Sequence, residues 1–270
     1  MSSLSLGLDT AQLAQHYDAV SLDRQFQAGK LLVERLGLRS GEHVLDVGSG
    51  TGLLAEYVAG IVGARGSVLA IDPLPLRIEI AKRRTQPNLT FRVGDAYDLA
   101  SFAAASFEVI YLNAVFHWLP EKLGPLREFH RLLAEGGRLG ITTGAGERLG
   151  TLQAVRKAVL AREPYARFSE SRDGTAHRVT LLELQGLLQQ TGFAISSIEV
   201  VPNVTFQPTP SAAIEFSQAS SFGNFLGHLP DDLRRSAREE IERELEAFRV
   251  PEGIRLDGAR IIAVAQRLNH

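Results

Sequence analysis

Apolar and polar positions along residues 43–143 alternate in blocks that predict repeated strand–helix units. Short, nearly continuous apolar runs are followed by stretches in which apolar residues recur every three or four positions. The apolar runs predict strands at 43–47, 67–71, 89–93, 107–112 and 138–143. The stretches between them predict helices at 53–62, 75–84 and 121–133. Apolar strands separated by helices are typical of an α/β fold with a parallel sheet that is covered on both faces.

The alternation of predicted strands and helices is interrupted twice after residue 143. Residues 145–178 are rich in charge and contain a helix-like piece at 151–162, and residues 208–250 form a second insertion. Elsewhere the pattern predicts regular elements, which are a helix over 180–193 that Gly192 ends and strands over 194–207 and 258–267. The sheet therefore has further strands after the first insertion.

The second insertion is expected to contain a surface helix with one apolar stripe. Asp231 and Asp232 suit the start of that helix, where the helix dipole favours negative charge. The stripe consists of Leu233, Ala237, Ile241, Leu245 and Phe248. The remaining face carries charges of both signs and is expected to contact solvent.

These patterns divide the chain into three parts. Residues 1–40 are expected to form an N-terminal helical lid. The insertions 145–178 and 208–250 are expected to form a helical cap over the active site, at the mouth of the sheet. The core then consists of residues 41–144, 179–207 and 251–270.

The amino-acid composition limits the classes of function that this protein can have. The chain is 44% hydrophobic and 22% charged, as is typical of soluble globular proteins, and its formal net charge of −2 gives no strong field for nucleic acid or membranes. There is no apolar run of the roughly 18–20 residues that a membrane span needs, and no secretory signal. The absence of cysteine excludes disulfides and cysteine nucleophiles and favours the cytoplasm. No pair of histidines has the spacing of metal ligands, so no metal is expected.

A glycine-rich turn follows the first predicted strand. Gly48, Gly50 and Gly52 lie directly before a predicted helix, an arrangement that lets backbone N–H groups approach a nucleotide-like ligand. The dinucleotide fingerprint G-x-G-x-x-G would require glycine at position 53, which is leucine here. The spacing is therefore wrong for a nicotinamide cofactor of the usual kind.

The stretch VLDVGSGTG, residues 44–52, resembles the first motif of class I S-adenosylmethionine-dependent methyltransferases. The resemblance implies a Rossmann-like sheet of seven strands in the order 3-2-1-4-5-7-6, with the seventh strand antiparallel. It also implies that the cofactor is S-adenosylmethionine, with S-adenosylhomocysteine as the product. The residues of this motif expected at the cofactor are Asp46, Gly48, Ser49, Gly50 and Gly52.

Further landmarks of the same family follow in order. Asp72, with Pro73 beside it, ends the second strand, and its carboxylate can accept hydrogen bonds from both ribose hydroxyls. Asp95 and Ala96 follow the third strand and resemble the residues that contact the adenine amine. Asn113 leads out of the fourth strand. All of them lie at the carboxyl ends of parallel strands, the edge at which open α/β sheets bind ligands.

The acceptor side of the site is expected just after Asn113. His117 and Trp118 resemble a turn in small-molecule carboxyl methyltransferases, such as those for trans-aconitate or malonyl-carrier acids. His117 could bind an acceptor carboxylate as imidazolium or remove a proton near neutral pH. In the alternative interpretation, Trp118 packs in the core and His117 binds a loop carbonyl.

Two other groups of residues are candidates for the active site. Tyr17 resembles an N-terminal tyrosine that folds over the cofactor in related enzymes, although an ordinary aromatic contact would also explain it. The cap offers cationic side chains that could clamp a carboxylate, but cap arginines are expected to be mostly solvated. These candidates are His177 and the arginines Arg162, Arg167, Arg172 and Arg178.

The sequence thus predicts an enzyme that methylates a small molecule, with a carboxylate oxygen as one candidate acceptor atom. One alternative is C- or O-methylation of a larger lipophilic or natural-product acceptor, as in the ubiquinone-type methyltransferases. Another is a catalytically inactive scaffold that binds the cofactor. The expected partners are a small-molecule substrate, no nucleic acid and no membrane, and the expected state is a monomer or homodimer.

Overall fold

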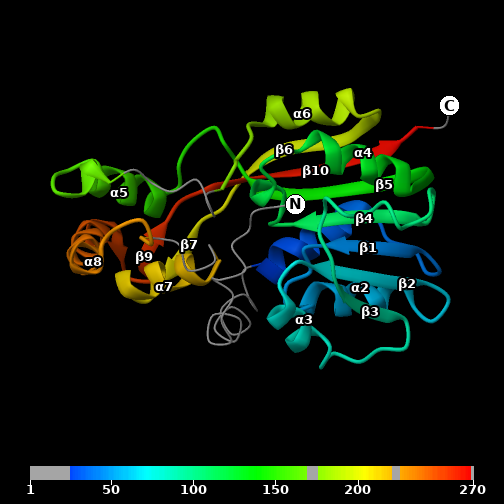
Figure 1. Cartoon of the computed structure of the whole chain (residues 1–270), viewed down its shortest axis with the longest axis horizontal. Coiled ribbons are helices and arrows are strands. Elements are labelled where there is room, and N and C mark those ends of the chain that lie inside the picture. Colours follow the sequence, from blue (N-terminus) through cyan, green and yellow to red (C-terminus); the bar gives the residue numbers. More distant parts are fainter. Residues whose placement is uncertain (1–24, 169–175, 221–225, 269–270) are drawn as a thin grey trace.

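The structure, a computed structural model, describes residues 25–168, 176–220 and 226–268. Its centre is a seven-stranded sheet (Figure 1) in the order β3-β2-β1-β4-β5-β10-β6. The strands are β1 (His43–Val47), β2 (Ser67–Asp72), β3 (Leu89–Val93), β4 (Phe107–Asn113), β5 (Leu133–Gly144), β6 (Phe193–Pro202) and β10 (Ala259–Arg267). Only β10, the seventh strand of this sheet in chain order, runs antiparallel to its neighbours. The predicted strand order is confirmed.

Helices cover both faces of this sheet. One face packs against helical residues 25–36 and against α2 (Leu53–Val62) and α3 (Pro75–Ala81), with Leu32, Val58 and Ile78 in the buried layer. The other face packs against α4 (Leu123–Leu132) and α6 (Leu181–Gln190), through Phe129 and Leu184 among others. The alternating pattern of the sequence is explained by these two apolar layers.

The insertions build a separate unit beyond the ends of the strands, at the left of Figure 1. Residues 145–168 and 203–258, which we call the cap, share a buried apolar cluster. Its helices are α5 (Thr151–Leu160), α7 (Pro210–Ser220) and α8 (Asp231–Leu245), with short 3-10 turns η3 (Tyr165–Arg167) and η4 (Glu246–Phe248). It also contains a small sheet of β7 (Thr205–Gln207), β9 (Gly253–Leu256) and β8 (Arg249–Val250).

The single strand predicted over 194–207 is wrong. β6 ends at Pro202, and β7 pairs with β9 in the small sheet instead of continuing along β10. Proline has no N–H for the ladder, and a strand normally ends or bends where the ladder is interrupted. The cap is therefore not purely helical, because strands from both sides of α8 belong to it.

The apolar stripe of α8 is confirmed except at its end. Ala237, Ile241 and Leu245 are fully buried and Leu233 is partly buried. Phe248 is 39% exposed, because the α-helix ends at Leu245 and the tighter η4 turn rotates the next residues off the stripe. In the described part of the chain, no helix is long and apolar enough to cross a membrane.

Candidate active site

The turn between β1 and α2 has no room for a side chain at Gly48 or at Gly52. Gly48, Gly50 and Gly52 have φ angles of 78°, 56° and 85°, in the left-handed region that favours glycine. A Cβ on Gly48 would lie 2.3 Å from Val115, and one on Gly52 would lie 2.5 Å from Phe91. The backbone N–H groups of this turn are consequently brought close to the sheet edge.

Asp72 holds the turn in place. Its carboxylate is buried and accepts hydrogen bonds from the N–H of Gly50 at 2.9 Å and the N–H of Leu74 at 2.9 Å. Sequence reasoning predicted contacts to a ribose and missed this structural task. A carboxylate has about four lone-pair positions, so Asp72 can accept more hydrogen bonds than these two.

Asp46 lies below the turn and pairs with Tyr111. The Tyr111 hydroxyl donates to Oδ2 of Asp46 at 2.7 Å, and both side chains are buried on neighbouring strands. Burial raises the pKa of Asp46 to about 7, and the nearby Asp72 charge acts in the same direction. Tyr111 was not identified from the sequence, because it occupies an ordinary apolar position of a predicted strand.

Several features of this edge fit the predicted cofactor. The Ser49 hydroxyl is buried without a hydrogen-bond partner in the part of the chain described, so a ligand group would satisfy it. No side chain caps the first turn of α2, whose N–H groups suit a carboxylate. Val93 is 55% exposed at the end of β3, close to the half-buried Asp95. An apolar surface beside a carboxylate suits a purine with an exocyclic amine.

The remaining predicted cofactor residues lie in the same loops. Ala96 is buried, and Oδ1 of Asp95 accepts the N–H of Tyr97 at 3.1 Å. Pro73 is half-buried between Asp72 and the start of α3. The loops after β2 and β3 start side by side, because Asp72 pairs with Val93 and the Gly94 N–H donates to the carbonyl oxygen of Asp72 at 3.1 Å.

Asn113 connects the sheet to the N-terminal helix. Its amide nitrogen donates to the carbonyl oxygen of Gln25 at 3.0 Å, and its amide oxygen accepts the Thr142 hydroxyl at 2.6 Å. A Cβ on Gly29 would lie 2.9 Å from the Asn113 amide nitrogen, so this glycine permits the close approach of helix 25–36. Gln25 and Thr142 were not identified from the sequence.

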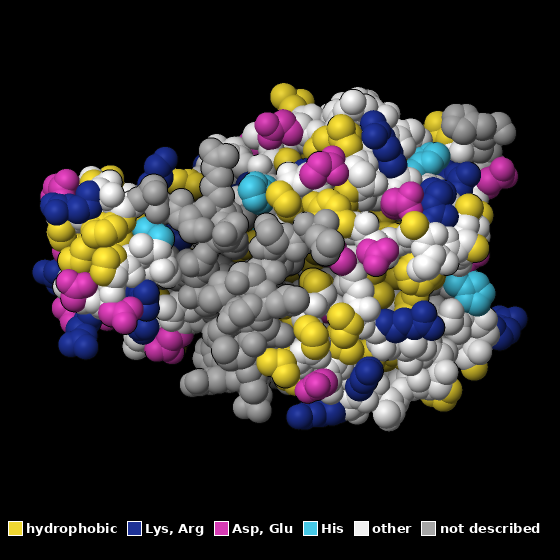
Figure 2. All heavy atoms as spheres, in the orientation of Figure 1, with side chains coloured by type: hydrophobic (Ala, Val, Ile, Leu, Met, Phe, Trp, Pro, Cys, Tyr) yellow, Lys and Arg dark blue, Asp and Glu magenta, His cyan; other side chains and the backbone are white. Residues whose placement is uncertain are grey.

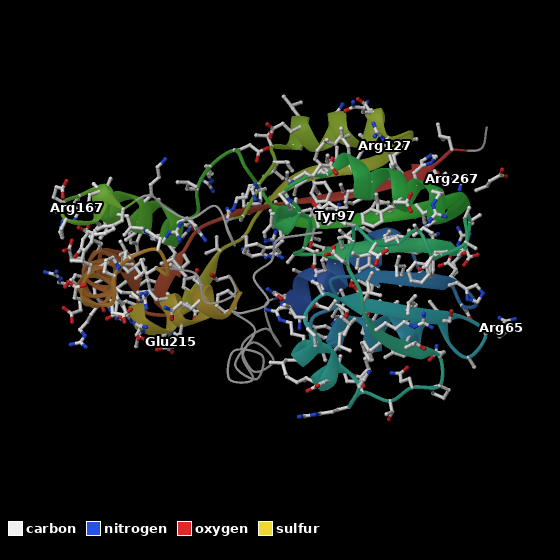
Figure 3. All side chains as sticks on the ribbon, in the orientation of Figure 1. Arg65, Tyr97, Arg127, Arg167, Glu215 and Arg267 are labelled. Atoms are coloured by element: carbon white, nitrogen blue, oxygen red, sulfur yellow. The ribbon has the colours of Figure 1, made fainter. Side chains whose placement is uncertain are left out.

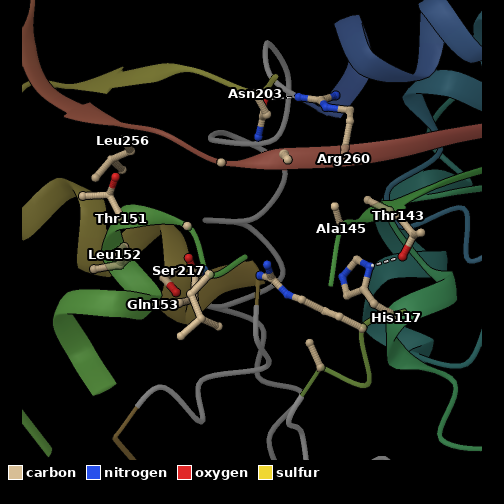
Figure 4. A pocket seen from close by; sticks show the side chains of 18 of the residues that line it. His117, Thr143, Ala145, Thr151, Leu152, Gln153, Asn203, Ser217, Leu256 and Arg260 are labelled. Carbon is tan, nitrogen blue, oxygen red and sulfur yellow. Dashed lines mark hydrogen bonds between the residues drawn. The ribbon is translucent and has the colours of Figure 1, made fainter. Parts of the chain in front are cut away.

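A cavity of about 780 Å³ opens next to Asn113, between the carboxyl ends of β4 and β5 and the cap (Figure 4). His117 and Trp118, in the 3-10 turn η2 (Phe116–Trp118), line the cavity, and their rings lie 4.8 Å apart. The interpretation in which Trp118 packs wholly in the core is therefore wrong. Both insertions contribute to the walls, which places this cavity between the sheet and the cap.

His117 does not titrate near neutral pH, contrary to the prediction from the sequence. Its Nδ1 lies 3.2 Å from the Thr143 hydroxyl, and Figure 4 shows the other ring nitrogen turned toward the cavity. Burial and the positive charges of Arg178 and Lys122 lower the pKa of His117 to about 3. The imidazole is thus neutral, and it hydrogen-bonds a hydroxyl instead of a loop carbonyl.

Cationic side chains dominate the cavity wall. Among the described residues that line it, the cations are Arg148, Arg156, Lys157, Arg178 and Arg260, whereas the only acid is Asp257. That carboxylate already forms an ion pair with Arg255, at 3.0 Å. The described lining therefore carries a net positive charge. Of these cations, sequence reasoning named only Arg178, because Arg260 and the residues of α5 come together with it only in the folded chain.

The cap arginines differ from one another in exposure. Arg162 and Arg167 form surface ion pairs with glutamates, and Figure 3 shows Arg167 at the outer tip of the cap, where basic and acidic side chains are mixed (Figure 2). Arg178 is half-buried in the cavity, so the expectation that cap arginines are solvated is wrong there. His177 donates its backbone N–H to the carbonyl oxygen of His117 at 2.7 Å. Tyr17 and Arg172 lie outside the described residues.

No metal centre is evident in residues 25–168, 176–220 and 226–268. Within these ranges, no three His, Cys, Asp or Glu side chains come together as ligands. Among the described residues, the cavity beside Asn113 therefore offers neutral and cationic hydrogen-bond donors.

Comparison with known proteins agrees with this geometry. Residues 45–141 match the family described as "Methyltransferase domain". The chain is 28% identical over 244 residues to a trans-aconitate 2-methyltransferase of Variovorax paradoxus, a match that covers 89% of this chain and 90% of that protein. It is 40% identical over 112 residues to an arsenite methyltransferase of Aquipseudomonas alcaligenes, a match that covers 38% of this chain and only 32% of that relative.

The fold is also found in solved structures. The YcgJ protein of Bacillus subtilis superimposes with a TM-score of 0.63 at 17% identity, covering 90% of this chain and 99% of that one. The matched domain spans most of the segment from β1 to β5, in a sheet whose strand order is the one that the motifs predicted. Residues 45–141 of this chain therefore form a methyltransferase domain, set in a Rossmann-like sheet of seven strands.

Proposed function

We propose that this methyltransferase transfers a methyl group to a carboxylate oxygen of a small organic acid. The observation that carries the proposal is the cavity beside Asn113, whose described lining has five cations and a single, already paired acid. A net positive cavity attracts and orients an anionic acceptor. Support also comes from the similarity to a trans-aconitate 2-methyltransferase along nearly the whole chain.

The cofactor is expected to lie along the edge formed by the loops after β1, β2 and β3. The residues that would hold it are Asp46, Gly48, Ser49, Gly50, Gly52, Asp72, Pro73, Asp95, Ala96 and Asn113. When bound, S-adenosylmethionine supplies an electrophilic methyl group on its sulfonium. The protein has to hold an acceptor oxygen in line with that group and to exclude water.

Arg178 and His117 are suited to hold the acceptor. A guanidinium can bind a carboxylate with two parallel hydrogen bonds. If the Thr143 hydroxyl donates to Nδ1 of His117, the cavity-facing nitrogen carries a hydrogen and donates as well. An ionised carboxylate has no proton to lose, so this reaction requires no general base. The neutral state of His117 is compatible with that role.

A second candidate follows from the same neutral imidazole. With the opposite tautomer, the cavity-facing nitrogen of His117 is an acceptor and can remove a proton from a hydroxyl or an acidic carbon of a larger natural-product acceptor. The cationic lining then stabilises the resulting anion. Trp118 would pack against the acceptor in either case.

The two candidates predict different products. Purified protein, labelled S-adenosylmethionine and a panel of small mono-, di- and tricarboxylic acids should give a methyl ester that mild alkali hydrolyses. An alkali-stable product from a phenol or carbon acid would favour the second candidate. Failure of every acid in the panel to accept a methyl group would refute the proposed acceptor class.

A further inference from the structure

Arg178 lies against Gly144 of β5, a residue without a side chain. A Cβ built on Gly144 would lie 3.4 Å from Cζ and 3.5 Å from Nε of Arg178, so the guanidinium covers the glycine. Arg178 is also the charge that acts most strongly on His117. Its guanidinium therefore lies near both Gly144 and His117.

Arg260 lies across from the same glycine on β10. It is the register partner of Gly144, and directly paired residues project from the same face of a sheet. Its guanidinium donates to the side-chain oxygen of Asn203, beyond the end of β6, as Figure 4 shows. The two arginines thus line the same cavity near Gly144, Arg178 against the glycine and Arg260 from the neighbouring strand. Two guanidiniums in one cavity can bind two carboxylate groups.

Neither guanidinium is neutralised within the described residues. Burial lowers the pKa of both arginines, and no acidic neighbour offsets the effect in either case. The side chain to which Arg260 donates, that of Asn203, is a neutral amide. Two partly desolvated cations without carboxylates are costly unless an anionic ligand binds between them.

We infer that Arg260, held by Asn203, forms a second anion subsite and that the acceptor is a dicarboxylate or larger polycarboxylate. Arg178 binds the carboxylate that is methylated, and Arg260 binds another carboxylate of the same molecule. The inference rests on the proposed acceptor class and adds a specificity residue to it. The geometry of the subsite is set by the pairing of β5 with β10.

A binding measurement tests this inference independently of the methylation reaction. Calorimetry on the protein saturated with S-adenosylhomocysteine should compare succinate, glutarate and adipate with butyrate, valerate and caproate, the monoacids of equal carbon number. At least one diacid should bind roughly 10- to 100-fold more tightly than its monoacid, the range expected for charged hydrogen bonds. Equal affinity in all three pairs would overturn the inference.

Two variants test the assigned residue. Arg260→Gln should bring the diacid-to-monoacid ratio close to one. Asn203→Asp should do the same with Arg260 intact, because the new carboxylate neutralises the guanidinium and competes with the ligand. Arg249→Gln removes an exposed cap arginine outside the cavity and should keep the ratio. A ratio that survives in both Arg260→Gln and Asn203→Asp would contradict the subsite.

Two further outcomes are informative. A diacid that binds as expected but yields no methyl ester would refute the proposed reaction while leaving the second subsite supported. Phosphono analogues of the same length should bind less tightly than the diacids. Tighter binding of a phosphono acid would overturn the assignment of the second group as a carboxylate.

Discussion

The N–H of Gly50 donates to Oδ2 of Asp72 at 2.9 Å, so the last residue of β2 fixes the turn that follows β1. Asp72→Ala removes this bond, the bond to Leu74 and the proposed ribose contacts. Affinity for S-adenosylhomocysteine should fall by about 1.5 to 3 kcal/mol, as expected when charged hydrogen bonds are lost. Calorimetry checks this, with exposed Asp98→Ala as the control. Unchanged affinity in Asp72→Ala would remove Asp72 from the site.

Asp46 should make stability depend on pH. Its folded pKa of about 7 lies above the ordinary value of 3.8, so the folded protein binds the proton more tightly than the unfolded chain. The stabilising contribution of Asp46 is complete below pH 3.8 and is lost as pH rises to about 7. Asp46→Asn should flatten urea-unfolding stability between about pH 4 and 7. The same slope in wild type and variant would contradict the assignment.

Lys122 should keep the pKa of His117 low. Lys122→Gln removes one of the two positive charges and should raise the pKa of His117, which nevertheless stays below 6.5 because burial is the largest cause. NMR titration of the His117 ring in both proteins measures the change. Lys82→Gln, at an exposed position directly after α3, should leave the titration unaltered. A lowered or constant pKa in Lys122→Gln would show that this charge does not reach the ring.

Gly48 should tolerate alanine less well than Gly37. Both have positive φ, 78° and 58°, so both substitutions carry backbone strain of about 1–2 kcal/mol. A Cβ at Gly48 also meets Val115 at 2.3 Å, whereas one at Gly37 meets nothing within 4 Å. Gly48→Ala should therefore lose more unfolding free energy than Gly37→Ala. Adding Val115→Ala should restore part of the difference, and the absence of any restoration would argue against the contact.

The features that could be predicted from the sequence depend on residues close together in the chain. Those that could not be predicted depend on contacts between distant residues. Strand order and the positions of Asp72 and Asn113 follow from local motifs, since a parallel strand and its following loop are contiguous. Arg260 was not predicted, because its place in the cavity depends on pairing with Gly144, over a hundred residues earlier. The lowered pKa of His117 was also missed, because its burial and the approach of Arg178 and Lys122 arise only in the folded chain.

The position of β10 also determines when the cavity is completed. The ribosome makes the glycine turn, Asp72, Asn113 and His117 long before Arg260, which lies in the last strand. β10 inserts between β5 and β6, so until β10 is made β6 has no partner in this sheet and β5 is paired only with β4. A nascent chain thus has the full cofactor motif while one wall of the acceptor cavity is missing. Truncation within β10 would separate the two halves of the site in the same way.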